Sequence, residues 1–170
     1  MELFIVRHGI AEALGKGNQF SDEKRVLTNE GRTRMREIAK GFAKLGIEVD
    51  LILSSPLARA VETAEIVAAA VGNNKKDIET TENLSPGASC DHLFAEIKSH
   101  PGAETIVLVG HQPDLGILLT RVIQGAAAGL AIQLKKGSIC CINVSETVPT
   151  LRGDMMWLLT PRQLRLIAKT

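Results

Sequence analysis

The sequence of 170 residues lacks an excess of either charge, and this absence excludes one broad class of partner. Its 20 Lys and Arg side chains face 19 Asp and Glu, which gives a formal net charge of +1 with histidine counted as neutral. A balance of this kind provides no overall attraction to polyanions or to a membrane surface. We therefore expect neither nucleic acid nor a membrane as a partner.

Cysteine and long apolar runs are also scarce. The three cysteines, Cys90, Cys140 and Cys141, are odd in number, and the adjacent pair would point to opposite faces of a strand. This disfavours a disulfide framework or a zinc cluster. Since no group of residues has the spacing of a metal site, we expect no metal and no other cofactor. The first apolar run stops at Arg7, so we expect no signal peptide, no spanning segment and a cytoplasmic location.

Short apolar runs alternate with longer helical patterns, and this indicates an α/β fold in a single domain over residues 1–170. The runs LFIV, LIL, DIET and TIVLV predict four strands, and helical patterns follow over 29–45, 56–71, 90–99 and 113–124. Such alternation predicts a mostly parallel sheet covered by helices. After Gln124, the runs AIQL, SICCINV and MMWLLT predict added strands, some of them antiparallel.

The first two helical patterns have capping residues at their ends. Thr28 is placed to cap the start of the first helix, and Gly46 its end. Ser55 is placed to cap the second helix, with Pro56 in its first turn and Gly72 beyond its end.

Basic and imidazole side chains follow three of the expected strands. They are Arg7, His8 and Gly9 after the first strand, Arg59 just after the second, and His111 and Gln112 after the fourth. Because parallel strands end at the same edge of a sheet, where helix N-termini also point free N–H groups, we expect these residues to converge. Arginine forks bind phosphate oxygens bidentately, and a glycine lets the chain approach an anion closely. The sequence therefore predicts a phosphate site.

A histidine in this position can act as a nucleophile. The like charge of Arg7 and Arg59 disfavours the protonated form of His8, and a neutral imidazole can attack phosphorus. Its second ring nitrogen needs a partner, commonly a backbone carbonyl, to fix the attacking tautomer. Arg7, Arg59 and a protonated His111 would stabilise the charge on the equatorial phosphoryl oxygens without a metal. Water would then hydrolyse the phosphohistidine intermediate.

Three stretches together resemble the histidine phosphatase superfamily, namely VRHGIAE, SSPLARAVETA and LVGHQPDLG. With RVLTNEGR, LSPGAS and GHQP, the chain is similar over about residues 1–160 to the SixA-type phosphohistidine phosphatases. The resemblance implies a three-layer, phosphoglycerate mutase-like sandwich in a small form without a lid. It also implies that His8 is the phosphorylated nucleophile, that Arg7, Arg59 and His111 complete the phosphate pocket, and that Arg25 lies at the site.

One position departs from the family pattern. Many members carry an acidic proton donor after the third strand, whereas alignment on LSP places Asn83 there, with Glu82 one residue away. A phosphohistidine substrate needs this acid less, because an imidazole protonated on its far nitrogen leaves as a neutral molecule.

Three functions remain open. The leading hypothesis is hydrolysis of phosphohistidine on a protein such as a phosphotransfer domain or a phosphocarrier. The alternatives are a phosphatase or mutase of small phosphorylated metabolites, and a non-catalytic phosphate-binding regulatory module. The short segments 13–25 and 85–89 leave little chain for a lid, which favours an open site that admits a protein. On this rim Lys16, Lys24 and Arg25 are candidates to steer an acidic partner.

Overall fold

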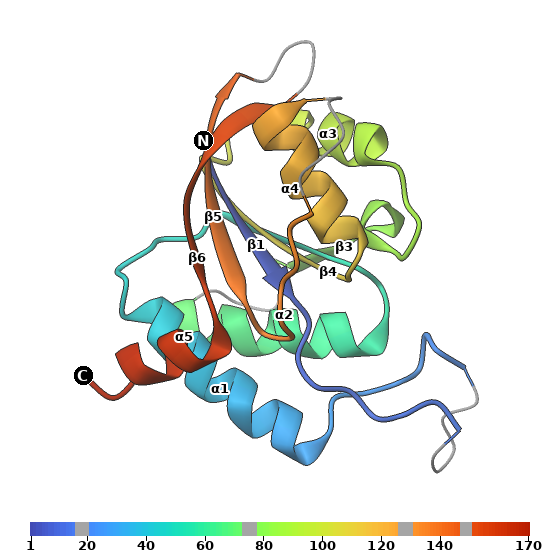
Figure 1. Cartoon of the computed structure of the whole chain (residues 1–170), viewed down its shortest axis with the longest axis vertical. Helices are drawn as coiled ribbons and strands as arrows, with labels where there is room; N and C mark the ends of the chain where they lie inside the picture. Colours follow the sequence, from blue (N-terminus) through green and yellow to red (C-terminus); the bar gives the residue numbers. More distant parts are fainter. Residues whose placement is uncertain (16–20, 73–77, 126–130, 147–150) are drawn as a thin grey trace.

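In the described part of the chain, six strands form one sheet with helices on both of its faces (Figure 1). The computed structural model describes residues 1–15, 21–72, 78–125, 131–146 and 151–170. The strands are β1 Glu2–Arg7, β2 Leu51–Ser54, β3 Ile78–Thr80, β4 Thr105–Gly110, β5 Ile139–Glu146 and β6 Arg152–Leu159. The helices are α1 Asn29–Ala43, α2 Ala58–Val71, the short 3-10 helix η2 Glu82–Leu84, α3 Cys90–Lys98, α4 Asp114–Gln124 and α5 Pro161–Ile167.

The sheet has the order β3-β2-β4-β1-β5-β6. The first four strands are parallel, whereas β5 runs antiparallel to both β1 and β6. This confirms the α/β fold with a mostly parallel sheet and antiparallel additions. The expected strand at 131–134 is wrong, because β4 and β5 already occupy both edges of β1. Leu134 instead lies in an irregular segment, where its carbonyl oxygen accepts a hydrogen bond from Arg7.

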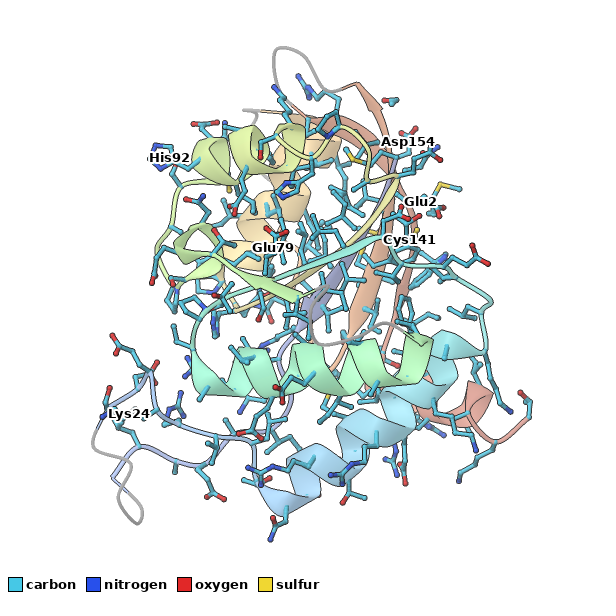
Figure 2. The ribbon with its side chains drawn as sticks, turned by 180° about the vertical axis from the view of Figure 1, so that it is seen from behind. Glu2, Lys24, Glu79, His92, Cys141 and Asp154 are labelled. Carbon is cyan, nitrogen blue, oxygen red and sulfur yellow. The ribbon has the colours of Figure 1, made fainter. Side chains whose placement is uncertain are left out.

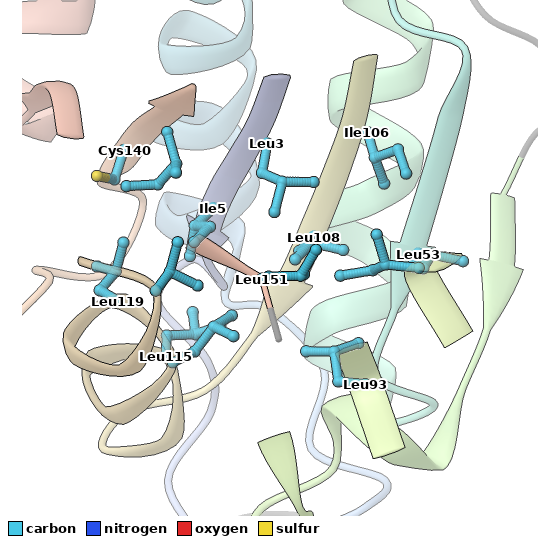
Figure 3. Close-up of a cluster of buried hydrophobic side chains, with 14 of the residues drawn as sticks. Leu3, Ile5, Leu53, Leu93, Ile106, Leu108, Leu115, Leu119, Cys140 and Leu151 are labelled. Atoms are coloured by element: carbon cyan, nitrogen blue, oxygen red, sulfur yellow. The ribbon is translucent and has the colours of Figure 1, made fainter. Parts of the chain in front are cut away.

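Alternate residues of each central strand enter one of two cores. Leu3 and Ile5 of β1 face α3 and α4, whereas Phe4 and Val6 face α1, α2 and α5. Cys140 and Cys141 are free thiols that enter opposite cores, as their adjacency predicts. The exposed side chain of Lys24 lies at the periphery (Figure 2), and aliphatic side chains fill the core beneath α3 and α4 (Figure 3).

The helix ends agree with the sequence at Thr28 and Gly72 but not at Gly46 or at the start of α2, because the C-cap of α1 is Lys44 and α2 begins at Ala58 rather than at Pro56. The Thr28 hydroxyl oxygen accepts from the Gly31 N–H at 2.9 Å, and Gly72 ends α2 with a left-handed φ of 81°. The expected N-cap at Ser55 is wrong, because the N-cap is Leu57. The Ser55 hydroxyl oxygen accepts from the Leu57 N–H at 3.4 Å and also lies 2.8 Å from Nε2 of His111.

Helix α5 was not expected from the sequence, although its start carries a clear signal. The Thr160 hydroxyl oxygen accepts from the Gln163 N–H, and the Gln163 side chain accepts from the Thr160 N–H at 2.8 Å. This reciprocal pair, with Pro161 in the first turn, is a capping box. The helix packs on α1, where a Cβ placed on Gly41 would lie 2.0 Å from the Leu164 carbonyl oxygen.

We expect Gly41→Ala to destabilise the protein even though alanine favours a helix, because the added methyl would force α5 away from α1. Overpacking of this kind lowers the free energy of unfolding by about 1–2 kcal/mol after the gain in helix propensity. Urea denaturation would measure the change. The matched control is Gly102→Ala, where a Cβ would meet no atom within 4 Å. Equal stability of the two variants would contradict the close helix contact.

Candidate active site

The carboxyl ends of β2, β4 and β1 lie side by side at one edge of the sheet. Arg7 of β1 is in register with Gly110 of β4, and Ser54 of β2 with Val109. The hydrogen bonding continues past the strands, since the His8 N–H donates to the Gly110 carbonyl oxygen at 3.1 Å. Residues that follow three different strands are therefore brought together at this edge.

His8 is a buried, neutral imidazole whose tautomer is set by the backbone. Its Nδ1 lies 2.7 Å from the carbonyl oxygen of Gly9. Since a carbonyl can only accept, Nδ1 carries the hydrogen and Nε2 keeps its lone pair. Burial lowers the pKa of His8 to about 3, with smaller contributions from the charges of His111, Arg59 and Arg7, against the opposing effect of the Gly9 hydrogen bond. Burial thus outweighs the like charge that the sequence suggested as the cause.

Gly9 and Thr63 tie this histidine to α2. The Gly9 N–H donates to the Thr63 hydroxyl oxygen at 3.1 Å, and that hydroxyl donates to the Arg59 carbonyl oxygen at 2.7 Å. A Cβ on Gly9 would lie 2.6 Å from Cγ of Met35, so the structure explains this glycine by close packing on α1. Sequence reasoning missed Thr63, whose signal was its position four residues after Arg59 on one helix face.

Arg59 and Arg25 converge on a carboxylate that the sequence did not single out. The terminal nitrogens of Arg59, which is 3% exposed, donate to the Asp22 carbonyl oxygen at 2.7 Å and to Asp22 Oδ2 at 2.8 Å. Arg25 Nε donates to Asp22 Oδ1 at 2.8 Å. Although burial acts to raise the pKa of Asp22, hydrogen bonds and charge from the two arginines lower it overall. Asp22 is therefore an anion held between two cations.

Arg7 is fixed by the segment before β5. Its NH1 donates to the Leu134 carbonyl oxygen at 2.6 Å, and burial lowers its pKa. Lys136 lies on the same segment, and its pKa is lowered by burial and then by the charges of Arg7, Arg25 and Arg59. Lys136 is thus a further cation at this edge. Its position could not be predicted from the sequence, because it depends on β5 returning beside β1.

His111 is neutral at pH 7 in this structure, which differs from the protonated form expected from the sequence. Its ring centroid lies 5.0 Å from that of His8, and its side chain is buried. Burial lowers the pKa of His111 to about 4, helped by the charge of Arg59, whereas Asp22 opposes the shift. A phosphoryl dianion in contact with the ring would favour its protonation.

Buried side-chain atoms that lack a hydrogen-bond partner lie on the predicted site residues. Within the described ranges, four buried side-chain nitrogen or oxygen atoms lack a hydrogen-bond partner, and all belong to residues singled out from the sequence: Arg7 Nε, Arg59 Nε, His111 Nδ1 and Gln112 Oε1. The amide nitrogen of Gln112 donates to the Ile132 carbonyl oxygen at 3.0 Å. Buried donors without acceptors cost about 1–3 kcal/mol each, so an oxyanion that accepts from both Nε–H groups would relieve the cost.

The segment after β3 offers no acid turned toward His8. The Asn83 amide nitrogen donates to Glu96 Oε2 on α3 at 2.8 Å. Glu82 is exposed and accepts a hydrogen bond from the Ser85 hydroxyl. Glu82 also lines a cavity of about 430 Å³ together with Asp22 and Glu23. This side of the site is therefore acidic.

Two comparisons of sequence bear on the site. The family model of the histidine phosphatase superfamily (branch 1) matches residues 3–85, which include His8, Arg25 and Arg59. An uncharacterized protein of Picosynechococcus sp. is 38% identical over 82% of each chain. The phosphohistidine phosphatase SixA of Escherichia coli is 24% identical over 98% of each chain.

Solved structures share the fold over nearly the whole chain. The protein histidine phosphatase SixA complexed with tungstate has a TM-score of 0.83 and 24% identity, and the match covers 96% of this chain and 99% of that one. An alpha-ribazole-5'-P phosphatase of Escherichia coli, described as putative, has a TM-score of 0.71 and 17% identity, and the match covers 95% and 97% of the two chains. These likenesses establish the three-layer architecture.

The depressed pKa of His111 predicts how stability depends on pH. An unfolded imidazole takes up a proton near pH 6.5, whereas the buried one does so only near pH 4, so the free energy of unfolding falls as the pH drops between these values. His111→Asn removes this contribution, so the free energy of unfolding of the variant should fall less over that interval than that of the wild type. At 1.36 kcal/mol per pKa unit, the difference between the two falls is up to about 3 kcal/mol. Urea unfolding at pH 6.5 and 4.5 measures it. If His92→Asn, at an exposed histidine, flattens the dependence equally, the burial of His111 is not its cause.

Proposed function

Because this chain belongs to the histidine phosphatase superfamily, we propose that it hydrolyses phosphohistidine on a protein through a phosphohistidine formed on His8. The observation that carries the proposal is the group of unpartnered buried nitrogens on Arg7, Arg59 and His111 around a neutral imidazole. Together they provide donors for phosphoryl oxygens and a nucleophile for phosphorus. The similarity to SixA over nearly the full length supports the substrate class.

The first step transfers the phosphoryl group between two imidazoles. The Nε2 lone pair of His8 forms a bond to phosphorus while the bond from phosphorus to the substrate nitrogen breaks. A substrate ring that is protonated on its far nitrogen takes up the bonding electron pair and leaves neutral, so no enzyme acid is required. Arg7, Arg59 and His111 stabilise the equatorial oxygens as negative charge spreads over them.

The second step returns His8 to its starting state. A water oxygen bonds to phosphorus as the bond from phosphorus to His8 Nε2 breaks, and the electron pair of that bond returns to Nε2. One proton of the water stays on the new hydroxyl and the other passes to a phosphoryl oxygen, so that dihydrogen phosphate leaves. The hydrogen bond from Nδ1 to the Gly9 carbonyl persists through both steps, because only Nε2 takes part. It stabilises the positive charge that the His8 ring carries while it is phosphorylated.

The site makes a non-catalytic regulatory module the weakest of the three hypotheses. Simple anion recognition needs donors, but it does not need an imidazole whose tautomer leaves Nε2 free. We therefore propose an enzyme of one domain over residues 1–170, with a phosphotransfer domain or a phosphocarrier as its substrate protein. The cytoplasmic location stays a prediction. None of the helices in the part of the chain that the structure describes is long and apolar enough to cross a membrane.

Small phosphorylated metabolites are the second candidate substrate, because the same fold matches an alpha-ribazole-5'-P phosphatase. An alcohol leaves poorly without a proton donor, and the positions after β3 hold Asn83 bonded to Glu96 and the exposed Glu82. This arrangement favours a nitrogen leaving group. Of the rim expected around an open site, residues 16–20, with Lys16, lie outside the described residues.

We expect brief mixing with a labelled phosphodonor to leave phosphate on His8 that is labile in acid and stable in base. His8→Ala should abolish the label and lower turnover by about three orders of magnitude or more, since it removes the attacking atom. Rapid quench and peptide mapping measure both. His92→Ala, at an exposed histidine, is the matched control and should behave as the wild type. Near wild-type turnover of His8→Ala would rule out the covalent mechanism.

A substrate panel decides between the protein and the metabolite. We expect kcat/KM for a phosphohistidine phosphotransfer domain to exceed that for phosphoserine peptide and sugar phosphates by at least about tenfold, because the site offers no acid for an oxygen leaving group. Free phosphohistidine should fall between them. If kcat/KM for a sugar phosphate is tenfold higher than that for the protein, the substrate is a small metabolite instead.

A further inference from the structure

A second cavity opens beside His8, on the side of the site away from Asp22. Its volume is about 500 Å³, and Gly9, Met35, Ile38, Lys135, Lys136 and Arg162 are among its lining residues. It therefore lies between the residue after His8, helix α1, the segment before β5 and the start of α5. We call it the basic groove.

The rim of the basic groove carries cations that have no carboxylate partner. Arg34 pairs with Glu30, and Arg165 pairs with Glu37. Within the described ranges, Lys135, Lys136 and Arg162 form no ion pair, and all three side chains are exposed. Since Lys136 also feels the charges of Arg7, Arg25 and Arg59, the positive potential of the groove continues into the active site.

The floor of the basic groove is apolar. Ile10 and Pro161, both half-buried, form its accessible apolar lining, whereas Met35 and Ile38 of α1 are almost fully buried beside them. A free phosphate would be held by buried donors that point at one spot, whereas here the cations stand exposed around an apolar floor. Such a surface complements acidic side chains that surround an apolar one on the surface of a protein.

The two sides of the site differ in charge. Glu23 and Glu82 line the cavity that adjoins the residues after β2 and β3, where Asp22 is already paired with Arg59 and Arg25, whereas lysine and arginine side chains line the basic groove that adjoins the residues after β1 and before β5. In the sheet order these strands lie on opposite sides of β4, which His111 follows. A partner with an acidic patch on one side of its phosphohistidine can therefore dock favourably in one orientation and meets repulsion in the reverse one.

We propose that the basic groove receives an acidic, partly apolar surface that flanks the phosphohistidine of the substrate protein, an assignment that rests on the proposed function. Lys135 and Arg162 attract the acidic side chains, and the apolar side chain between them covers Ile10 and Pro161. The groove thereby selects the substrate and orients its phosphohistidine toward Nε2 of His8.

The test reverses the two rim charges that lie outside the catalytic set, in Lys135→Glu with Arg162→Glu. The probes are two phosphohistidine peptides with one leucine, flanked either by glutamates or by glutamines. We expect the wild type to show a kcat/KM ratio of about ten in favour of the acidic peptide at low ionic strength, and the double variant a ratio of about one or less. Turnover of para-nitrophenyl phosphate should stay unchanged in the variant, which shows that it folds.

The matched control makes the same change in net charge elsewhere, in Lys44→Glu with Lys169→Glu. Both lysines are exposed and neither lines the groove, so this variant should keep the wild-type ratio. The assignment of the groove is wrong if the kcat/KM ratio of the two peptides is unchanged in Lys135→Glu with Arg162→Glu. It is also wrong if the ratio falls equally in both double variants.

Binding of the unphosphorylated acidic peptide separates the groove from the proposed function. Fluorescence anisotropy measures its Kd without any turnover, and we expect the Kd to rise about tenfold in Lys135→Glu with Arg162→Glu but not in the control variant. If this difference is seen while the wild type turns over neither phosphohistidine peptide, the groove stands and the proposed reaction is wrong. If both peptides are turned over and no difference in binding is seen, the groove is wrong and the reaction stands.

Discussion

Several positively charged side chains lie close together at one edge of the sheet. The hydrogen bonds and the protonation states around them limit the repulsion between these charges. Arg7 and Arg59 enter this edge from β1 and α2, and Arg25 and Lys136 approach it from two loops. The Leu134 carbonyl oxygen accepts from Arg7, the Asp22 carboxylate accepts from both Arg59 and Arg25, and both histidines stay neutral. The edge thus holds enough positive charge to attract a dianion, while each of its three arginines keeps a partner in the folded protein.

Hydrogen bonds between different secondary-structure elements hold the same edge in place. The Thr63 hydroxyl joins the Gly9 backbone to α2, and the Ser55 hydroxyl joins β2 to His111. Each bond links a residue that follows one strand to a residue that follows another. The geometry of the site is therefore a property of the sheet, because moving one side chain would require moving a strand end.

The sequence predicts this site as far as periodicity and the order of elements along the chain can carry it. The alternation of apolar and helical patterns predicts a parallel sheet whose strands end at one edge, which brings Arg7 and His111 to the same edge, whereas the pairing of β1 with β4 is known only from the structure. The partner of Arg59 could not be found this way, since Asp22 lies 37 residues away in a loop without periodicity. Ser55 was misread as a helix cap because a hydroxyl at the end of a strand can serve a helix or a distant imidazole, and only the fold decides which. Lys136 was missed for a similar reason, as β5 returns antiparallel to β1.

The carboxylate of Asp22 also bears on how a reaction cycle ends. A pocket of arginines that binds a phosphoryl group well also retains inorganic phosphate, which slows the next turnover. Asp22 is covalently part of the chain, so it competes for Arg59 and Arg25 at a constant, high effective concentration. Each departing phosphate is thus replaced by an anion that is already in place, and product inhibition is set by residues 21–25 as much as by the pocket itself.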